Sequence, residues 1–163
     1  VNAGMIDHDH WIVNKEIGGG RIVGEVCHFI DLLYFIMGSE VSKITHSQMG
    51  GKGDTLIITM IFKNGSVGSI NYFANGNKNY PKEKIEIFNS GKIYTVDNFR
   101  LLKIYNKNNA KKTRTFTQDK GQKGCIKSFL EAIKNETSMP IPIDDIFTVT
   151  DITLKVAEEC GYS

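Results

Sequence analysis

The sequence has few of the features that mark a secreted, membrane-spanning or nucleic-acid-binding protein. It contains only three cysteines, Cys27, Cys125 and Cys160, and their wide spacing argues against a disulfide framework and fits a reducing compartment. No apolar run reaches the roughly 18 residues that a membrane-spanning helix needs, and no signal peptide is visible. The formal net charge is only +2, too small by itself to indicate a nucleic-acid partner. We therefore expect a cytoplasmic protein with no membrane and no nucleic-acid partner.

What is present is the composition of one globular domain. Hydrophobic residues make up 40% and charged residues 23% of the chain, within the usual range for globular proteins. A length of 163 residues fits one domain with a substantial core. The chain opens with Val-Asn-Ala-Gly and no initiator methionine. We therefore expect residues 1–163 to form a single domain cut from a longer protein.

Hydrophobic periodicity predicts an α+β fold. Apolar residues at helical spacing predict a first helix from about residue 21 to 37, which Gly38 ends. Alternating patterns then predict strands at 41–48, 54–63, 66–74, 82–89, 92–97, 99–106 and 111–117. Tight turns such as Asn64-Gly65 and Ser90-Gly91 make neighbouring strands antiparallel. Two helices follow, over 120–136 and from about Asp144, so we expect a mostly antiparallel open sheet with helices packed on one face.

The segment GGGRIVGEVCHFIDLL, residues 18–33, contains the main site candidates. Glu25, His28 and Asp31 follow one another at intervals of three and form a stripe beside the apolar face of the helix. One interpretation is an imidazole that acts as acid or base and is oriented by a neighbouring carboxylate. The other is a helix edge where three polar side chains meet solvent, and spacing alone favours this second interpretation.

Glycines surround the start of this helix. Gly24 lies one turn before His28, where a glycine costs about 0.5–1 kcal/mol relative to alanine, so we expect it to leave open space beside the imidazole. The run Gly18, Gly19 and Gly20 has two interpretations. It either cradles a ligand by close approach of the backbone or forms a tight turn into the helix.

The loop before the glycines carries a second set of candidates. His10 and Trp11 either line a ligand pocket or, for the indole, cover the edge of the sheet. His8, Asp9 and His10 suggest a metal site only weakly, because no third ligand has recognisable spacing. We therefore predict no metal.

The segment 18–33 resembles the one that opens the C-terminal domain of the Gfo/Idh/MocA oxidoreductases, the family of glucose-fructose oxidoreductase and inositol dehydrogenase. In that family a GGG is followed four residues later by an Asp, then by a His and a second Asp. The glycines match at 18–20, the histidine at His28 and the second aspartate at Asp31. The first aspartate is replaced by Gly24. The strand-rich middle and the closing IPIDDI…LKVAEECG fit the same domain, so the resemblance covers nearly the whole chain.

This resemblance implies a glyceraldehyde-3-phosphate dehydrogenase-like C-terminal domain that binds the substrate and mediates assembly. It also implies an N-terminal Rossmann domain in the parent protein, which would bind NAD or NADP and supply a catalytic lysine. No GxGxxG follows a predicted strand in this chain, so we expect no cofactor in the chain itself. The implied substrate is a sugar, sugar nucleotide or cyclitol.

The resemblance also assigns roles to the candidates. It implies that His28 is catalytic, and we expect Glu25, Asp31 and Arg21 to support it or to bind substrate. His10 and Trp11 are expected to contact the substrate because polar and aromatic loop residues often line such pockets. The resemblance implies further that Gly18, Gly19, Gly20 and Gly24 lie near the cofactor. Because Gly24 replaces the family's aspartate, an alternative remains, in which this is a non-catalytic assembly or ligand-sensing domain.

Strand patterning predicts self-association. In strand 54–63, Leu56, Ile58, Met60 and Phe62 point to one face while Ile57 and Ile61 point to the other. An α+β domain can cover only one face with its helices, and the other face would leave more apolar surface exposed than a monomer usually has. We therefore predict a symmetric homodimer or a tetramer that is joined through the open sheet face. The family resemblance implies the same assembly.

Overall fold

The structure is a computed structural model that describes residues 1–7, 9–51 and 53–161. The chain forms two compact units. Unit 1 comprises Val1–Asn2 and Asn77–Pro140, and unit 2 comprises Ala3–Gly76 and Ile141–Ser163. Each unit combines an antiparallel sheet with helical structure, which confirms the predicted α+β class.

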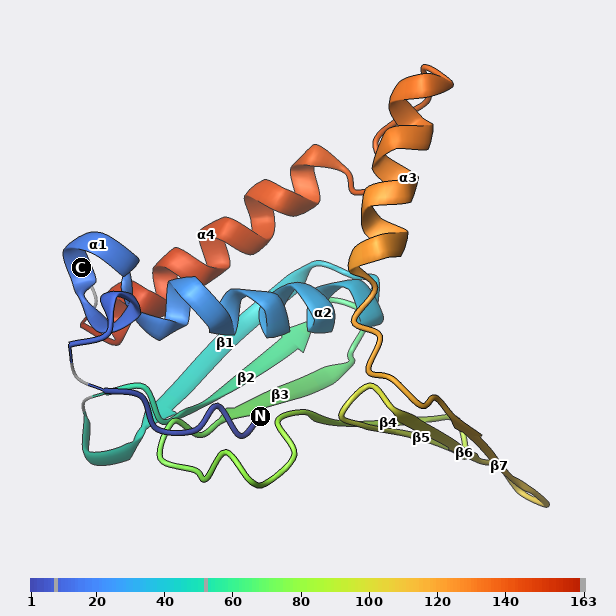
Figure 1. Cartoon of the computed structure of the whole chain (residues 1–163), viewed down its shortest axis with the longest axis horizontal. Helices are drawn as coiled ribbons and strands as arrows, with labels where there is room; N and C mark the ends of the chain where they lie inside the picture. Colours follow the sequence, from blue (N-terminus) through green and yellow to red (C-terminus); the bar gives the residue numbers. More distant parts are fainter. Residues whose placement is uncertain (8, 52, 162–163) are drawn as a thin grey trace. The chain divides into compact units, whose positions relative to one another are not determined.

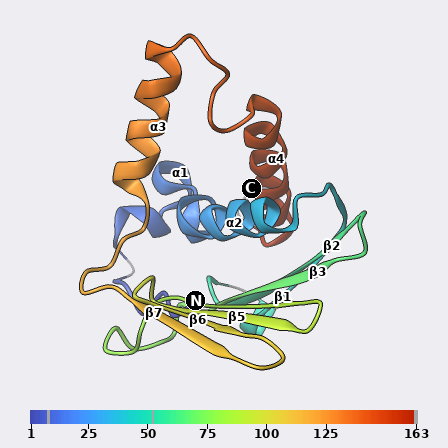
Figure 2. The same cartoon turned by 90° about the vertical axis from the view of Figure 1, so that its right-hand side faces the viewer.

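Unit 2 contains a three-stranded antiparallel sheet in the order β1-β2-β3. Figure 1 shows helices α2 and α4 on one face of this sheet, and the turned view in Figure 2 agrees. Its elements are η1 (Trp11–Val13), α1 (Lys15–Gly18), η2 (Ile22–Val26), α2 (Cys27–Met37), β1 (Val41–Gln48), η3 (Met49–Gly51), β2 (Leu56–Phe62), β3 (Val67–Tyr72) and α4 (Ile143–Glu159).

The core of unit 2 lies between this sheet face and the helices. Alternate residues of β2 are buried while the residues between them face outward, as period-two patterning requires. The buried set from the sheet and helices is Leu56, Ile58, Met60, Phe62, Ile70, Tyr72, Ile22, Val26, Ile30, Val149, Ile152 and Val156. Each such side chain contributes roughly 1.5–3 kcal/mol by leaving water. Helix α2 comes so close to β3 that a Cβ at Gly68 would lie 2.6 Å from Leu33 Cδ1.

The first helix has the predicted ends but not the predicted regularity. Gly38 ends α2 with φ 57° and ψ 34° and donates its N–H to Tyr34 O at 3.0 Å, as predicted for a glycine at this position. The turn from Ile22 to Val26, however, is π-helical. This wider turn contains Gly24, and it changes the direction of the side chains that precede residue 27.

Unit 1 contains a four-stranded antiparallel sheet in the order β4-β5-β6-β7 and one helix. Its elements are β4 (Lys84–Asn89), β5 (Lys92–Asp97), β6 (Leu101–Tyr105), β7 (Ala110–Arg114) and α3 (Gln122–Lys134). Every residue of these strands is half-buried or exposed. The apolar stripe of α3 is also exposed and consists of Ile126, Phe129, Leu130 and Ile133.

All the predicted strands are present, but they form two sheets and not one. The hairpin turns at Asn64-Gly65 and Ser90-Gly91 join strands as predicted, and both glycines have positive φ. The link between β3 and β4 runs from residue 73 to 83, longer than a tight hairpin turn, and β3 and β4 belong to different sheets. Within the described part of the chain, no helix has the length and apolar character that crossing a membrane requires.

Candidate functional site

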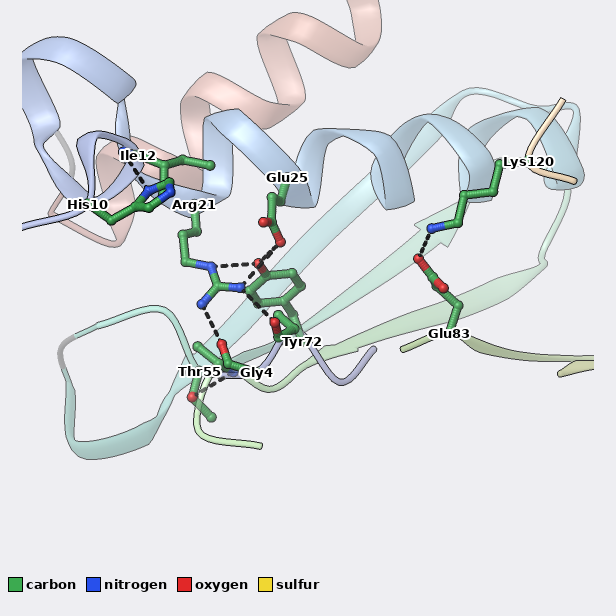
Figure 3. A network of polar contacts seen from close by, with 11 residues as sticks. Gly4, His10, Ile12, Arg21, Glu25, Thr55, Tyr72, Glu83 and Lys120 are labelled. Atoms are coloured by element: carbon green, nitrogen blue, oxygen red, sulfur yellow. Dashed lines mark hydrogen bonds and ion pairs between the residues drawn. The ribbon is translucent and has the colours of Figure 1, made fainter. Parts of the chain in front are cut away.

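Arg21 lies at the start of η2 and is almost completely buried, with 1% of its surface exposed. Its Nη1 donates to Gly4 O at 2.8 Å and its Nη2 to Ala3 O at 3.2 Å. Its Nε donates to the Tyr72 hydroxyl at 2.9 Å, and its Nη2 lies 3.4 Å from Glu25 Oε2. Figure 3 shows these contacts converging on one guanidinium group. A buried charge is tolerated when it is paired and hydrogen-bonded in this way.

Tyr72 completes this network, because its hydroxyl accepts from Arg21 and donates to Glu25 Oε2. Burial raises the pKa of Tyr72 well above its usual value, the hydrogen bond to Glu25 and its charge raise it further, and Arg21 opposes them. The Tyr72 hydroxyl is thus engaged on both sides, by Arg21 and by Glu25. The network joins residues 3–4, η2 and β3. The predicted contacts of Arg21 and Glu25 with a substrate stay predictions.

His28 and Asp31 are both exposed on α2. In the described part of the chain, neither side chain has a hydrogen bond or an ion pair. Glu25 lies in the π-helical turn, so the α-helical angle that placed it in line with His28 and Asp31 does not apply to it. The structure thus separates Glu25, which is engaged with Arg21 and Tyr72, from an accessible His28. Orientation of the imidazole by Asp31 stays a prediction.

The space beside Gly24 is not open, contrary to the expectation from the sequence. A Cβ at Gly24 would lie 2.9 Å from Ile12 Cδ1, and a Cβ at Gly18 would lie 2.6 Å from Ile12 Cα. The buried side chain of Ile12 fills this space because η1 packs against the helix start. Gly19 and Gly20 have φ values of 66° and 76°, which glycine adopts readily. The glycines therefore serve the turn and the packing of η1, and their proximity to a cofactor stays a prediction.

His10 and Trp11 lie next to each other on the same loop, as their positions in the sequence suggested. His10 Nδ1 accepts the N–H of Ile12 at 3.3 Å (Figure 3). The imidazole stacks on the indole with ring centroids 5.9 Å apart and an angle of 30° between the planes. Trp11 is 58% exposed, and its contact with a ligand or with the sheet edge stays a prediction. His8, the third residue of the weak metal hypothesis, lies outside the described residues.

One feature of unit 2 was missed by sequence reasoning. A groove of about 740 Å³ lies between β1 and α4, and its charged lining is mostly acidic: Glu40, Asp144, Asp145, Asp151 and Glu159, with Lys43 and Lys155. Burial raises the pKa of Tyr34 on its wall, and Asp145 adds to this through its charge and a hydrogen bond. Among the residues that the structure describes, no group of three His, Cys, Asp or Glu could hold a metal ion. Four of the five acidic residues lie on α4, but the groove depends on how α4 lies relative to β1, which no local pattern in the sequence shows.

The described residues do not fit a dinucleotide. A Rossmann site needs parallel strands with a glycine-rich turn that leads from a strand into a helix. In the described residues every strand pair is antiparallel, and Gly19 follows the short helix α1.

Residues 5–142 match the family model for the C-terminal alpha/beta domain of the Gfo/Idh/MocA oxidoreductase family. The chain belongs to this family. No curated protein sequence matches it significantly. The resemblance seen in the sequence would place the family's histidine at His28, which is exposed, and its first aspartate at Gly24; both assignments stay predictions. An aspartate there would meet the side chain of Ile12.

Solved structures support the fold of this family member. UDP-N-acetylglucosamine 3-dehydrogenase from Acidithiobacillus ferrooxidans superposes with a TM-score of 0.75 at 19% identity, over 99% of this chain and 52% of that one. Aldose-aldose oxidoreductase from Caulobacter crescentus gives 0.78 at 12% identity, over 97% and 51%. Levoglucosan dehydrogenase, solved with NADH and levoglucosan, gives 0.73 at 19% identity, over 93% and 51%. The chain thus spans about half the length of these proteins, and likeness at such identities concerns the fold alone.

Proposed function

We propose that the chain is the substrate-binding and assembly half of an NAD(P)-dependent oxidoreductase that acts on a sugar, sugar nucleotide or cyclitol. Membership of the oxidoreductase family supports the reaction class. The names of structural relatives that act on UDP-N-acetylglucosamine and levoglucosan support the substrate class. Because the described residues do not fit a dinucleotide, the NAD(P) would be bound by another domain of the complete enzyme.

The observation that carries this proposal is the state of His28. Its side chain is exposed, and in the described part of the chain it makes no hydrogen bond or ion pair. The resemblance in the sequence supports its assignment to the family's histidine position. An imidazole in this state can take the proton of a substrate hydroxyl during oxidation and return it during reduction. Asp31, one turn further along α2, would orient the imidazole or bind a second hydroxyl. Arg21 and Glu25 would support this site by fixing η2 to the sheet.

One observation favours the alternative of a non-catalytic assembly or ligand-sensing domain. The family's first aspartate is replaced by Gly24, and Ile12 packs into the space beside it. A general base normally contributes about 10²–10⁴-fold to the rate. If the missing carboxylate is essential to proton transfer, ligand binding would remain while turnover would be lost.

For assembly, we propose a symmetric homodimer, alone or within a tetramer, through the face of β1-β2-β3 that the helices leave open. Ile57 and Ile61 on this face are 42% and 36% exposed. Val67 is also exposed and pairs directly with Ile61. A twofold contact would cover each patch with its own copy.

The proposal is tested by steady-state kinetics of the complete protein and by calorimetry of this chain. We expect oxidation of UDP-N-acetylglucosamine, levoglucosan or inositol with NAD or NADP, and no micromolar dinucleotide binding by the 163-residue chain. Sugar binding without turnover would support the sensing alternative. Tight NAD(P) binding by this chain would contradict the division of roles.

A further inference from the structure

We propose that the stacked His10–Trp11 pair is a carbohydrate-binding platform and that Ile12 is the residue that positions it. The choice of a carbohydrate ligand rests on the proposed function, whereas the platform itself is a feature of the structure. Tryptophan is usually highly buried, yet Trp11 is exposed over more than half of its surface. A flat, exposed indole offers large contact area at low conformational cost and packs well against the C–H face of a sugar ring.

The platform has a defined polar edge as well as an apolar face. Because His10 Nδ1 accepts the N–H of Ile12, the ring proton of the neutral imidazole is on Nε2. The imidazole stacks on the indole, and we propose that a ligand binds to the exposed part of the indole. Nε2–H can then donate to a hydroxyl or ring oxygen at the rim of that ligand. An apolar face with a polar rim is the surface that a pyranose ring presents.

Ile12 holds the platform in place. It follows Trp11 directly and is 7% exposed, and its main chain and side chain occupy the space that Gly18 and Gly24 leave. A Cβ at Gly18 would lie 2.6 Å from both Ile12 Cα and Trp11 O, and a Cβ at Gly24 would lie 2.9 Å from Ile12 Cδ1. The glycines therefore set the distance between η1 and the helix start. The packing of Ile12 against Gly24 gives a structural reason for glycine at this position.

Charge favours a sugar ring over a nucleotide as the group on the platform. Asp7 and Asp9, just before His10, are both exposed. Nucleobases also stack on aromatic side chains, but these two carboxylates would repel the phosphates attached to a base. A neutral sugar has no such penalty.

Trp11 is the only tryptophan of the chain, so its intrinsic fluorescence reports on the platform alone. We expect a saturable change in emission when levoglucosan or N-acetylglucosamine is titrated, and none with uridine diphosphate. In calorimetry, Trp11→Ala should weaken sugar binding about tenfold, and His10→Ala about fivefold. No fluorescence response at saturating sugar, or equal affinity in Trp11→Ala, would overturn the platform. A response to uridine diphosphate and not to sugars would identify a nucleobase site and also refute it.

The positioning role of Ile12 has its own test. Gly24→Ala should shift the emission maximum of Trp11 and weaken sugar binding. The matched control Gly124→Ala should do neither, because a Cβ at Gly124, in α3, meets nothing within 4 Å. Adding Ile12→Val to Gly24→Ala removes Cδ1, the nearer of the two Ile12 side-chain atoms, and should restore both signals in part. If Gly24→Ala fails to fold, Ile12→Val alone should still shift the emission. Unchanged emission and affinity in the folded variants would refute the positioning role.

The two proposals fail in distinguishable ways. A sugar response of Trp11 without any NAD(P)-linked turnover by the complete protein would leave the platform standing and count against the enzymatic function. Turnover with a sugar that leaves Trp11 emission unchanged would support the function and exclude the platform.

Discussion

The guanidinium Nε of Arg21 lies 2.9 Å from the hydroxyl of Tyr72, and this contact joins the start of the helix that precedes His28 to the last residue of β3. Both residues are buried. A buried guanidinium is costly unless its donors are satisfied, and Arg21 achieves this with carbonyl, hydroxyl and carboxylate acceptors together. The helix start that carries the candidate site is therefore fixed by directional bonds as well as by apolar packing.

The first prediction concerns the stability of this network. Tyr72→Phe should lower the free energy of unfolding by about 1–3 kcal/mol, because it leaves a buried guanidinium donor and a carboxylate acceptor without their shared partner. Urea denaturation measures this change through the midpoint and the slope. Tyr80→Phe is the matched control, since the side chain of Tyr80 is exposed and should lose little. Equal effects of the two substitutions would contradict a stabilising role for the hydroxyl.

The elements were predictable because their signals are local. The predicted strand 41–48 agrees with β1 at both ends, the other strands agree within a few residues, and Gly38 ends α2 as expected. The Arg21 network was not predictable, because Tyr72 lies 51 positions away and no pattern in the sequence relates the two. Glu25 was assigned to the His28 stripe on α-helical geometry, which the π-helical turn does not follow.

The role of Gly24 also could not be predicted from the sequence, because it depends on a residue of another segment. From the sequence, a glycine before His28 indicated open space for the imidazole. In the structure a residue of the preceding loop, Ile12, fills that space. Hydrophobic periodicity identifies which face of a helix is buried, but it does not say which other segment packs there. The exposure of His28 likewise could not be predicted from the sequence. A stripe of polar residues has the same spacing whether its side chains face solvent or form hydrogen bonds within the protein.

The second prediction tests the assignment of His28 as the acid or base. In the complete enzyme, His28→Ala should lower kcat by about 10²–10⁴-fold, the usual contribution of general acid–base catalysis. The fold should survive because the side chain is exposed, and circular dichroism checks this. His10→Ala is a useful comparison, since it should act mainly on substrate affinity. Near-wild-type turnover of His28→Ala would contradict a catalytic role and favour the interpretation of His28 as a solvent-facing residue of the helix edge.

The third prediction concerns the reactivity of the three thiols. Cys125 is exposed, Cys27 is half-buried and Cys160 is buried. Burial raises the pKa of the Cys27 thiol, and burial together with the charge of Glu159 raises the pKa of Cys160 to about 11. Because the thiolate is the reactive form, alkylation near neutral pH should be fastest at Cys125 and slowest at Cys160. Mass spectrometry of a labelling time course measures the order, and urea should abolish the difference.

The raised pKa of Cys160 also predicts a pH dependence of stability. The folded state holds the thiol proton more tightly than the unfolded state, whose pKa is about 8.5. The stabilisation is therefore fully present below that value and is lost as pH rises toward about 11. Urea midpoints across this range should fall less in Cys160→Ala than in the unmodified chain. Parallel curves for the two proteins would contradict the raised pKa.

The last prediction concerns assembly through the open face of β1-β2-β3. The helices cover the opposite face, and Ile57 and Ile61 stay exposed on this one. Light scattering at micromolar concentration should give at least twice the 18.3 kDa of one chain. Ile57→Lys or Ile61→Lys should shift the mass to a monomer, because two copies would bring like charges together in an apolar contact. Ile17→Lys, at an exposed isoleucine of α1, should leave the mass unchanged. A monomeric unmodified chain would refute this interface, and so would lysine variants that keep the oligomeric mass.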